Sequence, residues 1–195
     1  MFRNFSISIA IITLTSQITG FASAQMEPDG LEFLEDRRVW VVEGSNQHTE
    51  IIDGDTLWLG NLQLRLYGID APEPGQECSI EGKPKSYCHM SATEALRSLA
   101  SSPNFRCDVK VKGKADRPWV RHNRYVANCY VGTLDVNAEI VRQGWAYADD
   151  LWGTKYDAEQ REAQARNAGM HASEHIKPSD WRRRERSSES SCSCP

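Results

Sequence analysis

The chain has 195 residues, of which 39% are hydrophobic and 26% are charged, a length that fits one domain with appended segments. The hydrophobic fraction is too high for a wholly disordered chain. The 23 basic and 27 acidic residues give a net charge of −4, which argues against a protein that covers nucleic acid with a broadly basic face.

Residues 1–24 have the three parts of a secretory signal peptide. Arg3 supplies a positive charge, residues 5–14 are mostly apolar, and Ala22-Ser23-Ala24 has the small-x-small pattern of a signal-peptidase site. Polar residues such as Thr13 make this stretch a poor membrane span, because each would need a hydrogen-bond partner in the bilayer. We therefore predict cleavage after Ala24 and a secreted or periplasmic protein without stable membrane insertion.

After a lead-in at residues 25–37, the hydrophobic pattern predicts short strands with helices between them. Strands are expected at 38–42, 55–59, 62–67, 105–112 and 125–131, and Gly60-Asn61 favours a hairpin between the second and the third. Helices are expected from about Ser91 to Ser101 behind a capping box, from Asp135 to Gly144, and from about 157 to 167. Five short strands with interposed helices suit a small closed barrel that carries helices, an α+β arrangement.

The predicted domain spans residues 38–181, and a polar tail follows at 182–195. The tail sequence RRRERSSESSCSCP has little apolar content, which predicts disorder. Its arginines at 182–184 and 186 could attract phosphate weakly, but a solvated tail is the interpretation we favour.

The six cysteines are an even number in a chain predicted to enter an oxidising compartment. None lies in a CxxC pair, so a zinc knuckle is not expected. Among the three pairings possible for the first four cysteines, Cys78–Cys88 with Cys107–Cys129 is the most local, and we predict it. Cys192 and Cys194 lie too close together to link parts of a core, so they either pair with another chain or stay free.

Acidic residues gather around the predicted hairpin. Asp53 and Asp55 stand where its first strand begins, and Asp70 and Glu73 follow its second strand. Antiparallel pairing brings these two ends together, so Asp55 and Asp70 should converge. Taken alone, the Asp-Gly and Asp-Ala-Pro sequences here are each ordinary turn sequences. Both acidic motifs lie on one hairpin, and Arg65 lies on the strand that leads to Asp70. Together they favour a site for a hard divalent cation such as Ca²⁺.

Four motifs together resemble the staphylococcal-nuclease, or thermonuclease-like, family over roughly Val39 to Trp181. They are IDGDT, RLYGIDAPE, the pair Asn123-Arg124 at a strand start, and EIVRQGWA. The resemblance implies an α+β fold built on a five-stranded oligonucleotide-binding (OB-fold) β-barrel with three helices. It also implies a Ca²⁺-dependent endonuclease that cleaves phosphodiester bonds in DNA or RNA, and we expect a monomer.

The resemblance assigns a metal site to the hairpin. Asp55 and Asp70 would bind Ca²⁺, with the backbone carbonyl of Ala71 as a further ligand, and Asp53 would support them from behind. Many relatives have threonine in place of Ala71, but a carbonyl ligand tolerates that change.

The resemblance also assigns three catalytic residues. Glu73 corresponds to the carboxylate that activates or orients the attacking water, and Arg65 and Arg124 correspond to two phosphate-binding arginines. Phosphoryl transfer needs an in-line water and neutralised phosphate oxygens, and the planar arginine fork supplies charge with geometry that lysine lacks. The loop before Arg124 is longer than in relatives, so Arg121 or Arg117 could take its place. We prefer Arg124 because Ala127 follows it at the spacing that is usual in the family.

Two functions from different classes remain. The first is a secreted Ca²⁺-dependent nuclease acting by metal-assisted attack of water. The second is a non-catalytic nuclease-like barrel that binds nucleic acid or assists an envelope or polysaccharide process. The full set of arginines and carboxylates favours the enzyme, because a pure binding module has no physical need for it. Asp149 and Asp150 replace tyrosines that often line the nucleotide pocket, which leaves the substrate preference open.

Overall fold

The computed structural model describes residues 31–34, 36, 39–44, 48–79, 81–85, 87–113 and 116–191. The predicted signal peptide, most of the lead-in, and Cys192 and Cys194 lie outside these ranges. Within them, no helix is long and apolar enough to cross a membrane.

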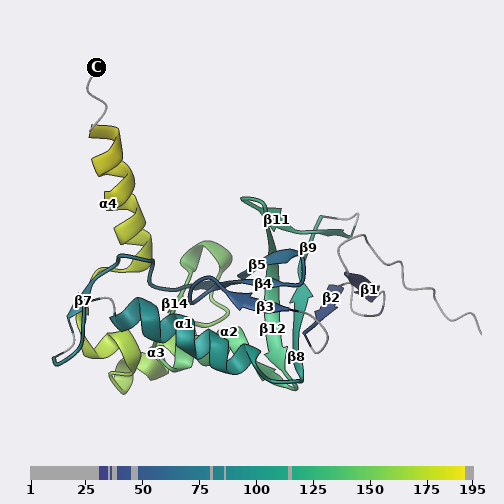
Figure 1. Ribbon diagram of the computed structural model, residues 1–195, viewed down its shortest axis with the longest axis horizontal. Helices are drawn as coiled ribbons and strands as arrows, with labels where there is room; N and C mark the ends of the chain where they lie inside the picture. Colours follow the sequence, from purple (N-terminus) through teal and green to yellow (C-terminus); the bar gives the residue numbers. More distant parts are fainter. Residues whose placement is uncertain are drawn as a thin grey trace, which may run out of the picture.

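A nine-stranded sheet forms the body of the fold, with the pairing order β1-β2-β8-β12-β5-β4-β3 (Figure 1). β5 and β12 pair in parallel, and the other neighbours in this sheet are antiparallel. The strands of the path are β1 (Glu32–Leu34), β2 (Val39–Glu43), β3 (Thr49–Ile51), β4 (Thr56–Leu59), β5 (Leu62–Leu66), β8 (Phe105–Val109) and β12 (Arg124–Val131). Off this path, β11 (Val120–Arg121) and β13 (Leu134–Asp135) each pair with β12.

Among the described residues, three two-stranded ribbons lie outside this sheet, and two of them join loops that lie far apart in the sequence. β6 (Ile69–Asp70) pairs with β14 (Tyr147–Ala148), β7 (Cys78–Ser79) with β15 (Glu174–His175), and β9 (Val111–Lys112) with β10 (Arg117–Pro118). The first of these ribbons places Asp70 opposite Tyr147. It thereby fixes the loop that leaves β5.

Four α-helices and two 3₁₀-helices complete the described part of the fold. α1 (Tyr87–Ala100), α2 (Val136–Arg142) and α3 (Asp157–Ala165) gather on one side of the strands, whereas α4 (Pro178–Ser191) projects outward and leads to the C-terminus (Figure 1). The 3₁₀-helices are η1 (Asp150–Trp152) and η2 (Gly169–Ala172). The predicted cap of α2 is confirmed, since the Asp135 side chain accepts a hydrogen bond from the Ala138 amide at 3.1 Å. α1 begins at Tyr87, before the predicted capping box.

The core lies between the sheet and the helices α1 and α2. Along β5, Leu62, Leu64 and Leu66 are at most 1% exposed, while the alternate residues are only half-buried. This alternation places Arg65 on the face of the strand away from the core. The fully buried residues that pack against these leucines include Leu57, Leu59, Ala92, Leu96, Val136, Ile140 and Val141. The apolar pattern of β5 therefore aims the arginine toward the candidate site.

The predicted α+β class is confirmed, but the closed five-stranded barrel is not. The strand pairings run in an open path from β1 to β3 among the described residues. The strand count also differs, because several pairings involve only two or three residues, as in β6, β7 and β15. Such short pairings have no alternation that a sequence pattern can reveal.

The tail differs from its prediction, because the chain is helical rather than disordered through Ser191. Pro178 opens α4, and proline suits the first helical turn since its missing N–H has no partner there anyway. Arginine and glutamate are good helix formers. Ion pairs of Arg182 with Asp70 and Glu73 then fix the first turns of the helix. Composition predicted disorder because it cannot register contacts between charged groups distant in the chain.

Both predicted disulfides, Cys78–Cys88 and Cys107–Cys129, are confirmed. The first links β7 to α1. The second joins residues that are direct register partners in β8 and β12. Each bond therefore connects elements that already pack together.

Replacing Cys107 and Cys129 together by alanine should lower the free energy of unfolding by about 3 kcal/mol, because the bond restricts the loop between them in the unfolded chain. That loop spans a sequence separation of 22, against 10 for Cys78–Cys88. The Cys78–Cys88 bond should therefore contribute less. Denaturant unfolding of the oxidised proteins measures both effects. An equal or larger loss for the Cys78 and Cys88 double variant would contradict the loop-length explanation.

Candidate active site

The β4–β5 hairpin and the turn after it bring Asp55 and Asp70 onto one guanidinium. Arg65 Nη1 pairs with Asp55 Oδ1, and Arg65 Nη2 lies 3.1 Å from Asp70 Oδ1. The two carboxylates are buried, at 1% and 3% exposure. Gly68 makes the turn between Arg65 and Asp70 with a φ of +74°, which favours glycine.

The buried carboxylate of Asp55 is held by several donors. Its Oδ2 accepts a hydrogen bond from the Ala71 amide at 2.9 Å, and its Oδ1 accepts one from the Thr56 hydroxyl at 2.9 Å. Burial raises the pKa of the Asp55 carboxyl, and the charge of Arg65 opposes that rise. Asp53 lies two residues before it in the chain, and its Oδ1 accepts a hydrogen bond from the Asp55 amide at 3.0 Å.

Gly54 allows α1 to approach this carboxylate closely. A Cβ at residue 54 would lie 2.6 Å from the Cβ of Ala92 and 2.7 Å from the Cβ of Ala71. Both distances are too short for any other residue without movement of the backbone. The glycine between Asp53 and Asp55 therefore has a packing reason, in addition to the turn that it makes.

Glu73 lies at the same site and has a partner that the sequence prediction missed. Its Oε1 accepts a hydrogen bond from Arg182 Nη1 at 2.6 Å, and the same guanidinium binds Asp70. Arg182 comes from α4, which is far from the hairpin in sequence. No local signal in the tail pointed to this contact beyond its run of arginines.

Arg124 and Arg121 reach the site together. They are opposite each other in the β11–β12 hairpin, whose turn residues His122 and Asn123 have φ values of +51° and +61°. Positive φ at both central positions matches the tight turns that suit right-twisted strands. Arg124 Nη1 lies 3.4 Å from the Thr56 hydroxyl. The structure thus brings both candidate arginines to the site, whereas Arg117 lies in β10.

These residues open into one cavity of about 550 Å³. Asp53, Arg65, Glu73 and Arg124 line it, and Asp55 and Asp70 lie beneath Arg65. Further positive charge in the wall comes from Arg121, Arg182, Arg183 and Arg186. Despite the negative charge of the whole chain, the cavity wall is therefore rich in cations, as a phosphate-binding cleft requires.

The donor set suits a hard divalent cation held by few protein ligands. Among the described residues, no group of three or more histidines, cysteines, aspartates or glutamates could hold a metal ion. Asp55 and Asp70 supply two buried carboxylates, and cations such as Mg²⁺ are commonly bound by one or two carboxylates with water. The guanidinium groups of Arg65 and Arg182 at these oxygens show that the position favours positive charge. The chemistry of the donors thus fits such an ion.

An aromatic cluster of Tyr67, Trp119 and Trp152 lies beside the cavity. The ring centroids of Trp119 and Trp152 are 4.8 Å apart, and those of Tyr67 and Trp152 are 5.2 Å apart. Each ring carries a cation, namely Lys110 over Tyr67, Lys112 over Trp119 and Arg121 over Trp152. Trp152 and Arg121 also line the cavity, so the cluster is continuous with the site.

Comparison with known proteins agrees with this geometry. Residues 63–173 match the family described as staphylococcal nuclease homologue. The chain is 34% identical over 145 residues to a protein named "Uncharacterized endonuclease" from Haemophilus influenzae, covering 70% of this chain and 72% of that protein. It is 28% identical over 123 residues to the "Succinoglycan biosynthesis protein ExoI" of Rhizobium meliloti, covering 62% of this chain and 61% of that protein.

Proposed function

Because the chain belongs to the staphylococcal nuclease homologue family, we propose that it hydrolyses phosphodiester bonds in DNA or RNA with a bound Ca²⁺ ion. Nucleases of this family are metal-dependent. The observation that carries the proposal is the position of Arg65 between two buried carboxylates, beside a cavity lined by Glu73 and Arg124. The arginines and the Glu73 carboxylate, the proposed base, then line the same cavity.

Asp55 and Asp70 are the side chains proposed to hold the ion, with the Ala71 carbonyl as a further ligand. The bound ion would polarise a phosphate oxygen and position water. Oxygen ligands favour a hard cation, and Ca²⁺ is the ion we propose. The buried position of both carboxylates excludes competing water and strengthens their attraction for a cation.

The residues proposed to act on the phosphate and on the attacking water are Arg65, Arg124 and Glu73. The two guanidinium groups neutralise the phosphate oxygens as negative charge builds up in the transition state. Glu73 accepts a proton from the attacking water or orients that water. Its side chain is partly exposed, at 25%, so water can reach it from the cavity.

The aromatic cluster supports a single-stranded substrate. Bases of an unpaired strand stack on aromatic side chains, and each stacked base contributes about 1–3 kcal/mol. The lysines and the arginine over the rings supply charge for the neighbouring phosphates. A strand that leaves the cavity past Trp152 would meet both features.

Replacing Trp152 by alanine should therefore weaken the binding of a single-stranded oligonucleotide about tenfold, the equivalent of one stacked base. Binding measured by fluorescence anisotropy, with a chelator present to prevent cleavage, checks this effect. Trp145→Ala is the matched control, since Trp145 is also half-buried but lines a different cavity, together with Glu139 and Arg142. Equal losses in the two variants would remove the aromatic cluster from the proposed binding surface.

Export to an oxidising compartment is part of the proposal. The two disulfides support it, because such bonds persist in secreted and periplasmic proteins and are rare in the cytosol. The signal-peptide pattern of the first 24 residues supports it independently. N-terminal sequencing of the exported protein, expected to begin at Gln25, tests the cleavage site. Size-exclusion chromatography tests the expected monomer.

A closed OB-fold barrel is also part of the proposal. β2 and β3 lie at or near opposite ends of the pairing path, yet only residues 44–48 separate them in the chain. If these two strands act as halves of one bent strand, they would join the two ends of the sheet, and barrels remove exposed edges in this way.

The deciding experiment is incubation of the mature protein with labelled single-stranded DNA and RNA, with Ca²⁺ or with a chelator. We expect cleavage with Ca²⁺ and none with the chelator. A second function is kept because one relative is named for succinoglycan biosynthesis. Oligonucleotide binding without cleavage under any divalent ion would favour that second candidate, a non-catalytic barrel in an envelope or polysaccharide process.

A further inference from the structure

Arg182 occupies Asp70, one of the two carboxylates proposed for the metal, and it also binds Glu73. Its Nη1 donates to Asp70 Oδ1 and to Glu73 Oε1 at 2.6 Å each, and its Nη2 donates to Asp70 Oδ2 at 2.8 Å. These distances lie at the short end for charged donors and acceptors, and a bidentate arginine pair is among the strongest of such contacts. Both oxygens of Asp70 are therefore engaged by one guanidinium.

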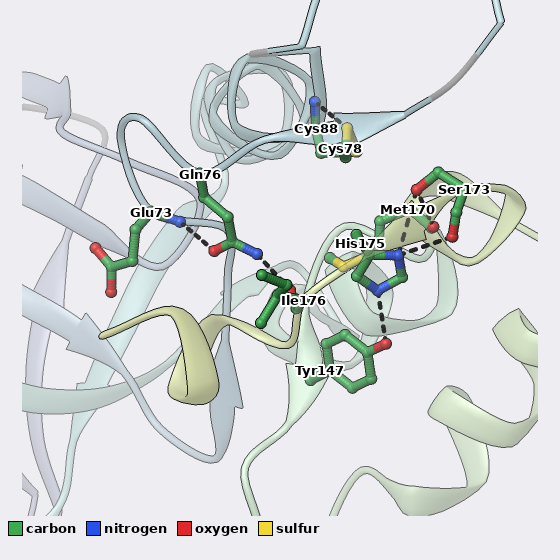
Figure 2. Close-up of a disulfide and its surroundings, with 9 residues drawn as sticks. All are labelled: Glu73, Gln76, Cys78, Cys88, Tyr147, Met170, Ser173, His175 and Ile176. Atoms are coloured by element: carbon green, nitrogen blue, oxygen red, sulfur yellow. Dashed lines mark hydrogen bonds between the residues drawn. A yellow bond between two sulfur atoms is a disulfide. The ribbon is translucent and has the colours of Figure 1, made fainter. Parts of the chain in front are cut away.

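The chain that leads into α4 is fixed to the same loop as Glu73. Gln76 is 2% exposed. Its side-chain amide donates to the Ile176 carbonyl at 2.6 Å, and its side-chain oxygen accepts from the Glu73 amide at 3.1 Å (Figure 2). The buried Gln76 side chain thus joins the loop that carries Glu73 to the segment just before α4.

Three further contacts strengthen this attachment. β15 pairs with β7, and the Cys78–Cys88 disulfide links β7 to α1. The Tyr147 hydroxyl and His175 Nε2 lie 2.7 Å apart (Figure 2), and Tyr147 is the register partner of Asp70. The position of Arg182 therefore follows from a packed attachment and not from a free tail.

The guanidinium and a divalent cation need the same lone pairs. A hard cation approaches carboxylate oxygens to about 2.0–2.6 Å, a position that the Arg182 nitrogens now take at Asp70. Arg65 alone reaches only one oxygen of Asp70, so it leaves the other available. Arg182 is therefore the group that occupies the second oxygen of Asp70.

We propose that α4 is an autoinhibitory strap whose Arg182 competes with the divalent cation for Asp70 and at the same time holds Glu73, the proposed base. This inference rests on the metal site of the proposed function. Binding of the ion then requires withdrawal of Arg182, and by linkage the ion loosens α4 to the same extent that α4 weakens the ion. The strap makes the active site responsive to anything that draws α4 away.

The test is Ca²⁺ affinity of the full mature chain, measured by calorimetry without substrate. Arg182→Gln should bind Ca²⁺ at least fivefold more tightly than the native protein, the lower end of common coupling strengths. Arg182→Lys, which keeps the charge but loses the fork, should lie between them. Arg184→Ala is the control, because it removes the same charge from an exposed position of α4 and should leave the affinity unchanged.

Hydrogen exchange gives a second readout that needs no catalysis. Amides of residues 182–188 should exchange faster in the native protein when Ca²⁺ is added, and should exchange equally fast with or without it in Arg182→Gln. Unchanged affinity in Arg182→Gln, or weaker binding, would overturn the strap while leaving the proposed nuclease intact. Failure of both proteins to bind Ca²⁺ would overturn the strap together with the proposed metal site.

Discussion

Replacing Arg124 by lysine should lower kcat by about 10² or more with only a modest change in KM, because the planar fork stabilises charge that develops in the transition state. Lysine keeps the positive charge, so attraction of the substrate changes little. Arg124 Nη1 lies 3.4 Å from the Thr56 hydroxyl and has no ion pair with a buried carboxylate in the described part of the chain, so the substitution leaves no such carboxylate without a partner. Cleavage of a labelled oligonucleotide with excess Ca²⁺ measures kcat and KM separately.

Arg121→Lys is the matched variant, because Arg121 faces Arg124 across the β11–β12 hairpin and lines the same cavity. We expect a smaller loss of kcat in Arg121→Lys than in Arg124→Lys. The opposite order would assign the catalytic arginine to residue 121. A variant whose KM rises while kcat stays constant would place that arginine in substrate binding alone.

Arg65→Lys should lose a similar factor in kcat, but its effect will not be confined to catalysis. Arg65 bridges Asp55 and Asp70, both buried. Lysine cannot contact two carboxylates with a rigid fork, so one buried charge would lose a hydrogen-bonded partner, which destabilises a protein. Thermal unfolding of Arg65→Lys beside Arg124→Lys separates the two consequences. Only the former should unfold earlier.

The second large effect is expected at the proposed metal ligands. Asp55→Asn and Asp70→Asn should each weaken Ca²⁺ binding by about 100-fold or more, since loss of groups that merely support a metal ligand already weakens binding by 10–100-fold. Asparagine has almost the shape of aspartate, so charge is the main property removed. Calorimetric titration with Ca²⁺ measures the loss, and circular dichroism verifies that each variant is folded.

Asp53→Asn and Glu73→Gln serve as graded controls for the metal prediction. Asp53 accepts a hydrogen bond from the Asp55 amide and is proposed to support the metal ligands without binding the ion, so its loss should weaken Ca²⁺ binding less. Glu73→Gln should reduce kcat through loss of proton acceptance or of water orientation, with a smaller effect on Ca²⁺ affinity. Unaltered Ca²⁺ affinity in both Asp55→Asn and Asp70→Asn would move the metal away from this hairpin.

Much of the site's framework followed from sequence because its determinants are close together in the chain. The alternation of leucines in β5, the Gly60-Asn61 turn and the two acidic motifs all lie between residues 52 and 73. Hairpin pairing turns that spacing directly into geometry. The disulfide pairing could be predicted for a similar reason, because the four cysteines form the pairs that are closest in the sequence. The order of the motifs sufficed to identify the family.

The distant side chains at the candidate site could be identified only from the three-dimensional structure. Arg182 meets Asp70 across 112 residues of chain, and Tyr67 meets Trp152 across 85. Periodicity and propensity report on neighbours within a few residues, so they predicted a disordered tail where ion pairs hold a helix against the site. A polar segment can be ordered by a few well-placed charges whose partners are invisible locally. The carboxylates of the β4–β5 hairpin and Arg65 could therefore be found from local sequence patterns, whereas the residues that cover them depend on three-dimensional packing.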